Sequence, residues 1–139
     1  MKNFSLSRPT EQDLQNLLKE RIVIMDGAMG TMIQQEKLEE EDFRGEHFKN
    51  HAKELKGNND LLCLTRPDII RNIHQSYFDA GSDIVETNTF SATTISMADY
   101  NLEEIVPELN ISAARLAREA ADAAMIKDPS RPRFVAGAI

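Results

Sequence analysis

The sequence predicts an α/β protein whose strands form a parallel sheet. Three short apolar runs, at residues 22–25, 83–87 and 134–138, are typical of buried strands. Stretches with helical spacing, at residues 67–80 and about 92–125, separate them, and this alternation requires parallel pairing through crossover connections. A closed barrel of eight such units needs about 250 residues. The 139 residues therefore suit about three βα units, the N-terminal portion of a (β/α)8 TIM barrel.

A short amphipathic helix precedes the first strand. Thr10 can cap it, because Asp13 lies three positions later, as in a capping box. Its apolar face carries Leu14, Leu17 and Leu18. We treat residues 1–20 as a lead-in segment and expect its helix to pack on the outside or the bottom of the sheet.

Residues 36–66 interrupt the pattern. Acidic residues dominate 36–42, mostly polar residues follow, and residues 57–60 (GNND) form a turn cluster. The apolar run at 61–64 is too short to assign by its period. Because the stretch is longer than the usual βα connection, we expect a solvated insertion within a domain of residues 21–139.

Regular elements return after the insertion. Pro67 opens a helix and Gly81 ends it. The next helical region is broken near Asn101 and Pro107, and its alanine-rich second half, residues 111–125, suits packing against a sheet. The third apolar run reaches the last residue without a turn or a polar tail. A domain seldom ends this way, so we expect this one to be truncated at the end of its third strand.

Composition excludes several classes of protein. The net charge of −7 and pI of about 5.0 argue against a nucleic-acid or anionic-membrane surface. No apolar run approaches the ~20 residues that span a bilayer, and the first residues lack the apolar core of a signal peptide. A single cysteine fits a reducing compartment. We expect a cytoplasmic protein without nucleic-acid or membrane partners.

The strongest candidate site follows the first strand, where ligands bind in parallel α/β proteins. In one interpretation, the backbone N–H groups of Gly27, Ala28 and Met29 bind a carboxylate at a helix start. Asp26 would hold a cationic group beside it, which completes a site for the two charged groups of an amino acid. In the other interpretation, Gly27 and Gly30 form a tight turn and Asp26 only caps the following helix. The G-x-x-G spacing is not a dinucleotide fingerprint.

Glu86 and Asn88 end the second strand and share one of its faces. With Asp26 on the inner side of the same edge, Glu86 would place a second carboxylate near an ammonium group. The structural alternative is that Glu86 pairs with Arg21 or Arg133.

The metal candidates are weaker. His47 and His51 have the i, i+4 spacing of a helical chelate, but they lack the H-E-x-x-H pattern and are more typical of a solvated helix face. Cys63 cannot form a thiolate zinc site alone and is expected to be a small buried residue. His74 is expected to be a packing or interfacial residue.

Five segments in order carry a family resemblance: RIVIMDGAMGTMIQ, EEDFRGEHF, KGNNDLLCLTRPDIIRNIH, AGSDIVETNTF and FVAGAI. Together they resemble the N-terminal homocysteine-binding domain of cobalamin-dependent methionine synthases over residues 20–139. DGxMGT and the TNTF-like strand end are shared by homocysteine S-methyltransferases generally. The DFRG and GNND segments are similar to the cobalamin-dependent branch.

This resemblance implies a (β/α)8 barrel that holds homocysteine, with its thiol bound to zinc and methylated from methylcobalamin. Methyltetrahydrofolate would recharge the cobalamin through later domains. Substrate contacts map onto Asp26, Gly27, Ala28, Met29, Glu86 and Asn88. The family's three zinc cysteines come from late strands, and Cys63 matches none of them.

For this chain alone we therefore expect no catalytic residue, no metal site, no bound cofactor and no activity. Its partners would be homocysteine, the remainder of the barrel, and the folate and cobalamin domains. The alternative is a non-catalytic α/β module that binds an amino-acid-like anion or a partner chain.

Overall fold

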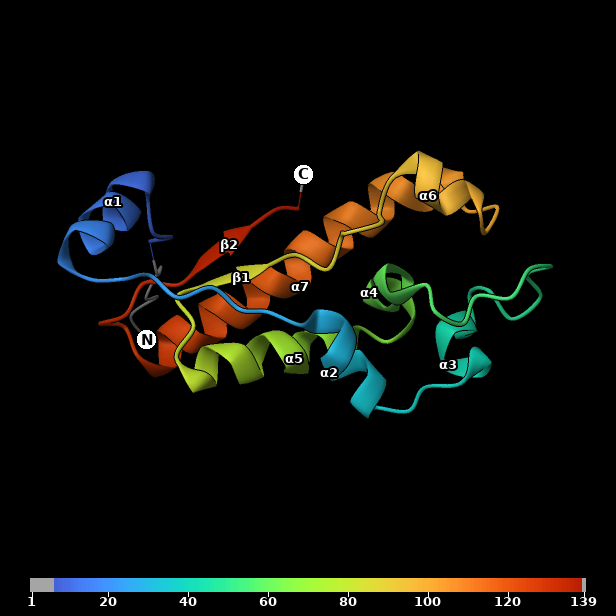
Figure 1. Ribbon diagram of the computed structural model, residues 1–139, viewed down its shortest axis with the longest axis horizontal. Helices are drawn as coiled ribbons and strands as arrows, with labels where there is room; N and C mark the ends of the chain where they lie inside the picture. Colours follow the sequence, from blue (N-terminus) through green and yellow to red (C-terminus); the bar gives the residue numbers. More distant parts are fainter. Residues whose placement is uncertain (1–6, 139) are drawn as a thin grey trace, which may run out of the picture.

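The computed structural model of the protein describes residues 7–138. In chain order the elements are α1 (Glu11–Glu20), α2 (Met29–Gln35), α3 (Glu40–Arg44), η1 (Asn59–Leu61), α4 (Leu62–Thr65), α5 (Pro67–Ala80), β1 (Ile84–Glu86), α6 (Thr94–Ala98), η2 (Glu103–Ile105), α7 (Val106–Lys127) and β2 (Phe134–Ala136). Strands β1 and β2 pair in parallel, and the long helices α5 and α7 lie beside each other against this sheet (Figure 1). The predicted α/β class is confirmed, as a helix-rich chain with a small parallel sheet.

The predicted first strand forms only in part. Met25 makes an isolated parallel bridge with Ile84, and the Ile24 carbonyl accepts hydrogen bonds from the N–H groups of Asp83 and Ile84, at 2.8 and 3.2 Å. The segment therefore flanks β1 on the edge opposite β2. Its predicted burial is wrong, because no described element covers its outer side: Ile22 is 85% exposed and Ile24 is 55% exposed.

Helix α1 begins as predicted, and its leucine face is only partly buried. The capping box is present, since the Asp13 carboxylate accepts the Thr10 N–H at 2.7 Å and Thr10 Oγ1 accepts the Asp13 N–H. The helix buries no residue, and Figure 1 shows it set apart from α5 and α7. On its leucine face Leu14 and Leu17 are half-buried and Leu18 is 57% exposed, so the expected packing on the sheet is at most partial within residues 7–138. Residues 1–6 of the predicted lead-in segment lie outside the described residues.

The segment 36–66, predicted as a solvated insertion, contributes to the main hydrophobic core. Its buried members are Phe43, Leu55, Leu61, Leu62 and Cys63. Arg44 organises the polar part: its guanidinium pairs with Glu40 at 2.6 Å and donates to the carbonyls of His51 and Lys53 at 2.6 and 2.9 Å. Glu40 in turn accepts the N–H of Leu55 at 2.9 Å. These side chains satisfy an irregular backbone, which explains why a polar sequence is ordered here.

The two long helices follow the predicted signals. Pro67 lies in the first turn of α5, and Gly81 ends it in the left-handed conformation, with φ 114°. The predicted break at Asn101 is confirmed by its positive φ of 55°. Pro107 lies in the first turn of α7, where proline is tolerated, and so it begins this helix instead of breaking it. Small buried residues of α7 (Ala117, Ala120, Ala121 and Ala124) allow close packing against Phe78 and Val85.

The buried carboxylate of Asp83 joins the amino ends of the strands. Both terminal nitrogens of Arg21 donate to it at 2.7 Å, and the Ile24 N–H donates at 3.0 Å. Arg131 and Arg133 lie 3.4 and 3.8 Å away. The Arg21 hydrogen bonds lower the pKa of Asp83 to about 2. This cluster holds segment 21–26 against β1 and thereby aligns the opposite, carboxyl ends of both segments.

Candidate functional site

A pocket of about 570 Å³ lies at the carboxyl end of β1. It is lined by residues 26–30, 57–60, 86–88, 90–91, 96–97 and 99–100. The residues that the sequence predicted as substrate-binding all lie on its wall, and they are Asp26, Gly27, Ala28, Met29, Glu86 and Asn88. Two segments that are 60 positions apart therefore meet where predicted. That they bind a substrate remains a prediction.

Strand β1 positions Asp26. Asp26 Oδ1 accepts a hydrogen bond from the Glu86 N–H at 3.0 Å, and the Asp26 N–H donates to the Ile84 carbonyl at 2.9 Å. Helix α2 is capped at Ala28 with no side-chain hydrogen bond, so the alternative interpretation of Asp26 as its cap is wrong. Burial, together with the negative charge of Glu86, raises the pKa of Asp26, although the Glu86 N–H opposes this shift.

The turn after Asp26 presents backbone to the pocket. Helix α2 begins at Met29, and the N–H groups of a first helical turn have no acceptor within the helix. A Cβ atom added at Gly27 would meet nothing within 4 Å, so this side of the backbone is open. The turn can therefore donate to an anionic group.

Glu86 and Asn88 differ in exposure and in hydrogen bonding. Glu86 is exposed at the pocket, and its predicted alternative partners, Arg21 and Arg133, lie near Asp83 instead. Asn88 is 6% exposed, and its Nδ2 donates to the Asn59 carbonyl at 2.9 Å. The amide group of Asn88 thus holds the pocket wall together, whereas the Glu86 carboxylate faces solvent.

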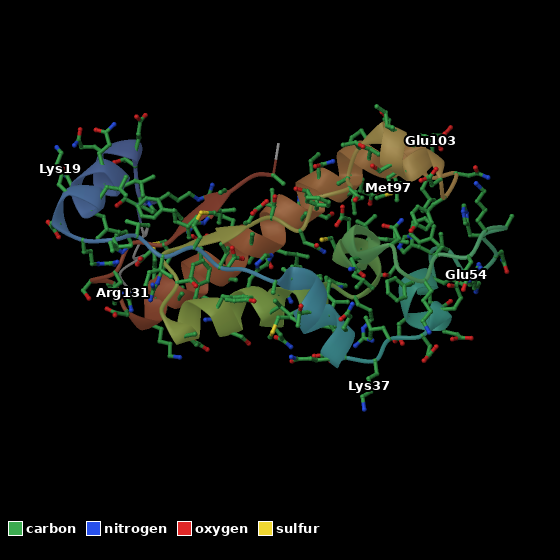
Figure 2. The ribbon with its side chains drawn as sticks, viewed as in Figure 1. Lys19, Lys37, Glu54, Met97, Glu103 and Arg131 are labelled. Carbon is green, nitrogen blue, oxygen red and sulfur yellow. The ribbon has the colours of Figure 1, made fainter. Side chains whose placement is uncertain are left out.

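Sequence reasoning missed the wall that segment 57–60 contributes. Asp60 is 4% exposed, and its Oδ2 accepts the Ser91 N–H at 2.6 Å. Burial raises the pKa of Asp60 to about 6, against the Ser91 hydrogen bond. Asn58 Nδ2 lies 3.4 Å from the sulfur of Met97, which is on α6 (Figure 2). The sequence predicted only a turn at the GNND cluster. The available signal for a buried acid was the position of Asp60 directly before the apolar run 61–64.

The pocket has an acidic lining. Its carboxylates are Asp26, Asp60, Glu86 and Asp99, and no described lysine or arginine lines it. Such a lining favours a cationic group. A ligand that also carries an anion must place it against backbone N–H groups, and the turn at residues 27–29 provides these.

The metal candidates do not assemble. Within residues 7–138, no group of three His, Cys, Asp or Glu side chains is arranged to hold a metal ion. Residues 45–50 form turns, so the predicted helix face with His47 and His51 is wrong, and His51 Nε2 lies 2.7 Å from the Tyr100 carbonyl. Cys63 is buried as predicted, and burial raises the pKa of its thiol to about 12. His74 is fully buried in the core, which matches its predicted packing role.

Comparison with known proteins assigns the family. The sequence profile of homocysteine S-methyltransferases matches residues 23–139. This chain belongs to that family. Its structure is similar to the metallated form of the homocysteine methyltransferase MmuM from Escherichia coli, with a TM-score of 0.69 and 25% identity over 89% of this chain. The oxidized form of MmuM gives a TM-score of 0.65 and 25% identity over 88%.

The chain spans 40% of the length of these MmuM chains. The pocket therefore belongs to a segment of a homocysteine methyltransferase fold. No helix in the described part of the chain is long and apolar enough to cross a membrane.

Proposed function

We propose that this chain forms the substrate-positioning part of a cobalamin-dependent methionine synthase, in which homocysteine receives a methyl group and becomes methionine. The observation that carries the proposal is the pocket, which combines an exposed backbone turn with carboxylates at the ends of adjacent sheet segments. The family assignment makes homocysteine the expected ligand.

In the proposed complex, the α-carboxylate of homocysteine accepts hydrogen bonds from the N–H groups of Gly27, Ala28 and Met29. Its ammonium group lies between the carboxylates of Asp26 and Glu86, and Asn88 forms the adjacent wall. One oxygen of Asp26 is already held by the Glu86 N–H at 3.0 Å, so this carboxylate is preorganised before the ligand arrives. The charged groups then orient the thiol for methylation.

Zinc and cobalamin belong to the proposal through the family resemblance. A zinc ion would lower the pKa of the thiol and supply thiolate at neutral pH. The described residues do not fit this metal, because no three potential ligands cluster and Cys63 is a buried thiol whose pKa is about 12. We therefore assign binding and orientation to this chain, and no catalytic residue. The zinc ligands and the cobalamin and folate domains would lie elsewhere in the enzyme.

The position of this chain in a barrel follows from the same family resemblance. We propose that it forms about three βα units at the N-terminus of a (β/α)8 barrel, in a cytoplasmic enzyme. The exposed outer edge of residues 22–25 would then contact another part of the barrel, which accounts for the 85% exposure of Ile22 in this chain.

Asp26→Asn tests the proposed function in the enzyme that carries this chain. Loss of a charge-assisted hydrogen bond is worth about 1.5–3 kcal/mol, which predicts a rise of roughly 10- to 100-fold in the KM for homocysteine. The matched control is Glu54→Gln, which removes an equal charge from an exposed residue outside the pocket wall (Figure 2). An unchanged KM in Asp26→Asn would contradict the assigned ammonium site. Binding of homocysteine without methyl transfer would favour the non-catalytic alternative.

A further inference from the structure

We propose that Asp60 is a positioning residue of the pocket: it accepts the Ser91 N–H and thereby fixes the loop between β1 and α6. The inference rests on the proposed function for its effect on homocysteine binding. The contact itself is independent of that function. It gives segment 57–63, in the predicted insertion, a role in building the substrate site.

The contact between Asp60 and Ser91 belongs to a group of links between the same two segments. Asp60 Oδ2 accepts the Ser91 N–H at 2.6 Å, and Asn88 Nδ2 donates to the Asn59 carbonyl at 2.9 Å. The Cys63 thiol lies 3.7 Å from the Asn88 carbonyl. One side of the loop is thus attached at two positions, Asn88 and Ser91, which enclose Phe90.

The segment that carries Asp60 is firmly anchored. Leu61 and Leu62, which follow Asp60 directly, are 0% exposed. Asn58 Oδ1 accepts the Leu61 N–H and caps the short η1 turn. A carboxylate on such an anchored segment can define the position of the backbone it binds, because its own side chain has few alternative positions.

The two ends of the loop and its middle are held by different contacts. Between β1 and α6 the Thr87 N–H donates to the Ala136 carbonyl at 2.9 Å, and the Thr89 and Ala92 N–H groups close short turns at 2.8 and 3.2 Å. The Ala92 carbonyl accepts a hydrogen bond from Asn110 Nδ2 at 2.8 Å. Phe90 lines the pocket and is nevertheless 90% exposed, so packing does not hold it. With the two ends of the loop held in this way, the Asp60 and Asn59 contacts fix its middle, between Asn88 and Ser91, relative to Glu86.

The burial of Asp60 makes it depend on the Ser91 N–H. It is 4% exposed, and burial raises its pKa to about 6. A hydrogen-bond acceptor at this depth needs a donor to offset its desolvation. The Ser91 N–H supplies this donor to one oxygen of Asp60, at 2.6 Å.

Two substitutions separate positioning from charge. Asp60→Asn keeps the length of the side chain and an oxygen that can accept the Ser91 N–H, but it removes the charge. Asp60→Glu keeps the charge but adds a methylene, which displaces the carboxylate from Ser91. If Asp60 acts by position, Asp60→Asn keeps the KM for homocysteine within threefold, whereas Asp60→Glu raises it about tenfold with little change in kcat. The opposite order would overturn the proposal and assign Asp60 a direct electrostatic role.

Amide hydrogen exchange at Ser91 tests the contact without homocysteine. Asp60→Glu is expected to speed exchange of this amide at least tenfold, while Asp60→Asn and the control Glu54→Gln leave it within threefold. Unchanged exchange in Asp60→Glu, or faster exchange with an unchanged KM, would overturn the proposal. If the unsubstituted protein does not bind homocysteine, the proposed function fails, and Ser91 exchange still reports on the contact. Should Asp60→Glu not fold, Asp60→Ala, which lacks an acceptor, serves in both assays with the same expectations.

Discussion

Replacing Asp83 by asparagine should destabilise the protein by about 3 kcal/mol. Its side chain is 1% exposed and accepts two hydrogen bonds from Arg21, each 2.7 Å long. Arg133, 4% exposed, lies 3.8 Å away and would lose its compensating charge. Breaking a buried ion pair by removing one partner costs about 3–5 kcal/mol. Because the Arg21 side chain is 40% exposed, we take the lower end of that range.

The acid dependence of stability gives a second value for the same interaction. The pKa of Asp83 falls from 3.8 to about 2 in the folded protein, and each unit corresponds to about 1.4 kcal/mol, so about 2 kcal/mol depends on ionisation. A lowered folded-state pKa means that this stability is fully present above pH 4. It is lost as the pH falls from about 4 to about 2. In Asp83→Asn this part of the acid sensitivity should be absent.

Urea unfolding followed by circular dichroism measures both effects. The free energy of unfolding is compared at pH 7 and along a series from pH 5 to pH 2. Asp79→Asn is the matched control, because its pair with Lys127 is exposed (47% and 73%) and should contribute less than about 1 kcal/mol. A loss below about 0.5 kcal/mol in Asp83→Asn would refute the reasoning that this cluster holds segment 21–26 to β1.

Further predictions concern the core and the helix ends. Burial lowers the pKa of His74 to about 4, so protonation of the unfolded chain should reduce stability by about 2 kcal/mol between pH 7 and pH 5. His74→Leu should remove that loss in denaturation experiments at the two pH values. Leu55→Ala should lower the free energy of unfolding by about 2–5 kcal/mol, because Leu55 is 0% exposed, whereas Leu18→Ala, at 57% exposure, should change it little. Gly81→Ala should lower the melting temperature through a cost of about 1 kcal/mol, since φ is 114° there and a Cβ atom would meet no neighbour.

Local signals predicted several helix ends. Thr10 with Asp13, and Pro67 with Gly81, mark helix ends through contacts within a few residues, and the structure contains both. Packing was harder to predict, because it depends on residues that are distant in sequence. The apolar run 22–25 was expected to be buried, yet an apolar pattern cannot tell which neighbour covers it.

Segment 36–66 was expected to be solvated, yet part of it is buried in the core. Its charged residues are typical of a solvated loop. In the structure, however, Arg44 and Glu40 pair with each other and form hydrogen bonds with the backbone of the same segment. Leu55 can then enter the core within a polar stretch. Composition alone does not reveal such pairing.

The place of the pocket was predictable where it follows from strand ends. Asp26 and Glu86 meet because parallel strands bring their carboxyl ends to one edge. Asp60 and Ser91 were not predicted, because their contact depends on how two irregular segments pack. The pattern of a turn cluster carries no information on its distant partner.

Titration of the protein with L-homocysteine, followed by backbone NMR, tests the central claim most directly. We predict that the largest amide shifts occur at residues 26–30 and 86–88, and that Asp26→Asn weakens binding at least tenfold. L-Homoserine, which carries the same amino and carboxylate groups, should shift the same amides. Binding that shifts other residues, or that is unaffected by Asp26→Asn, would contradict the assignment of this pocket to homocysteine.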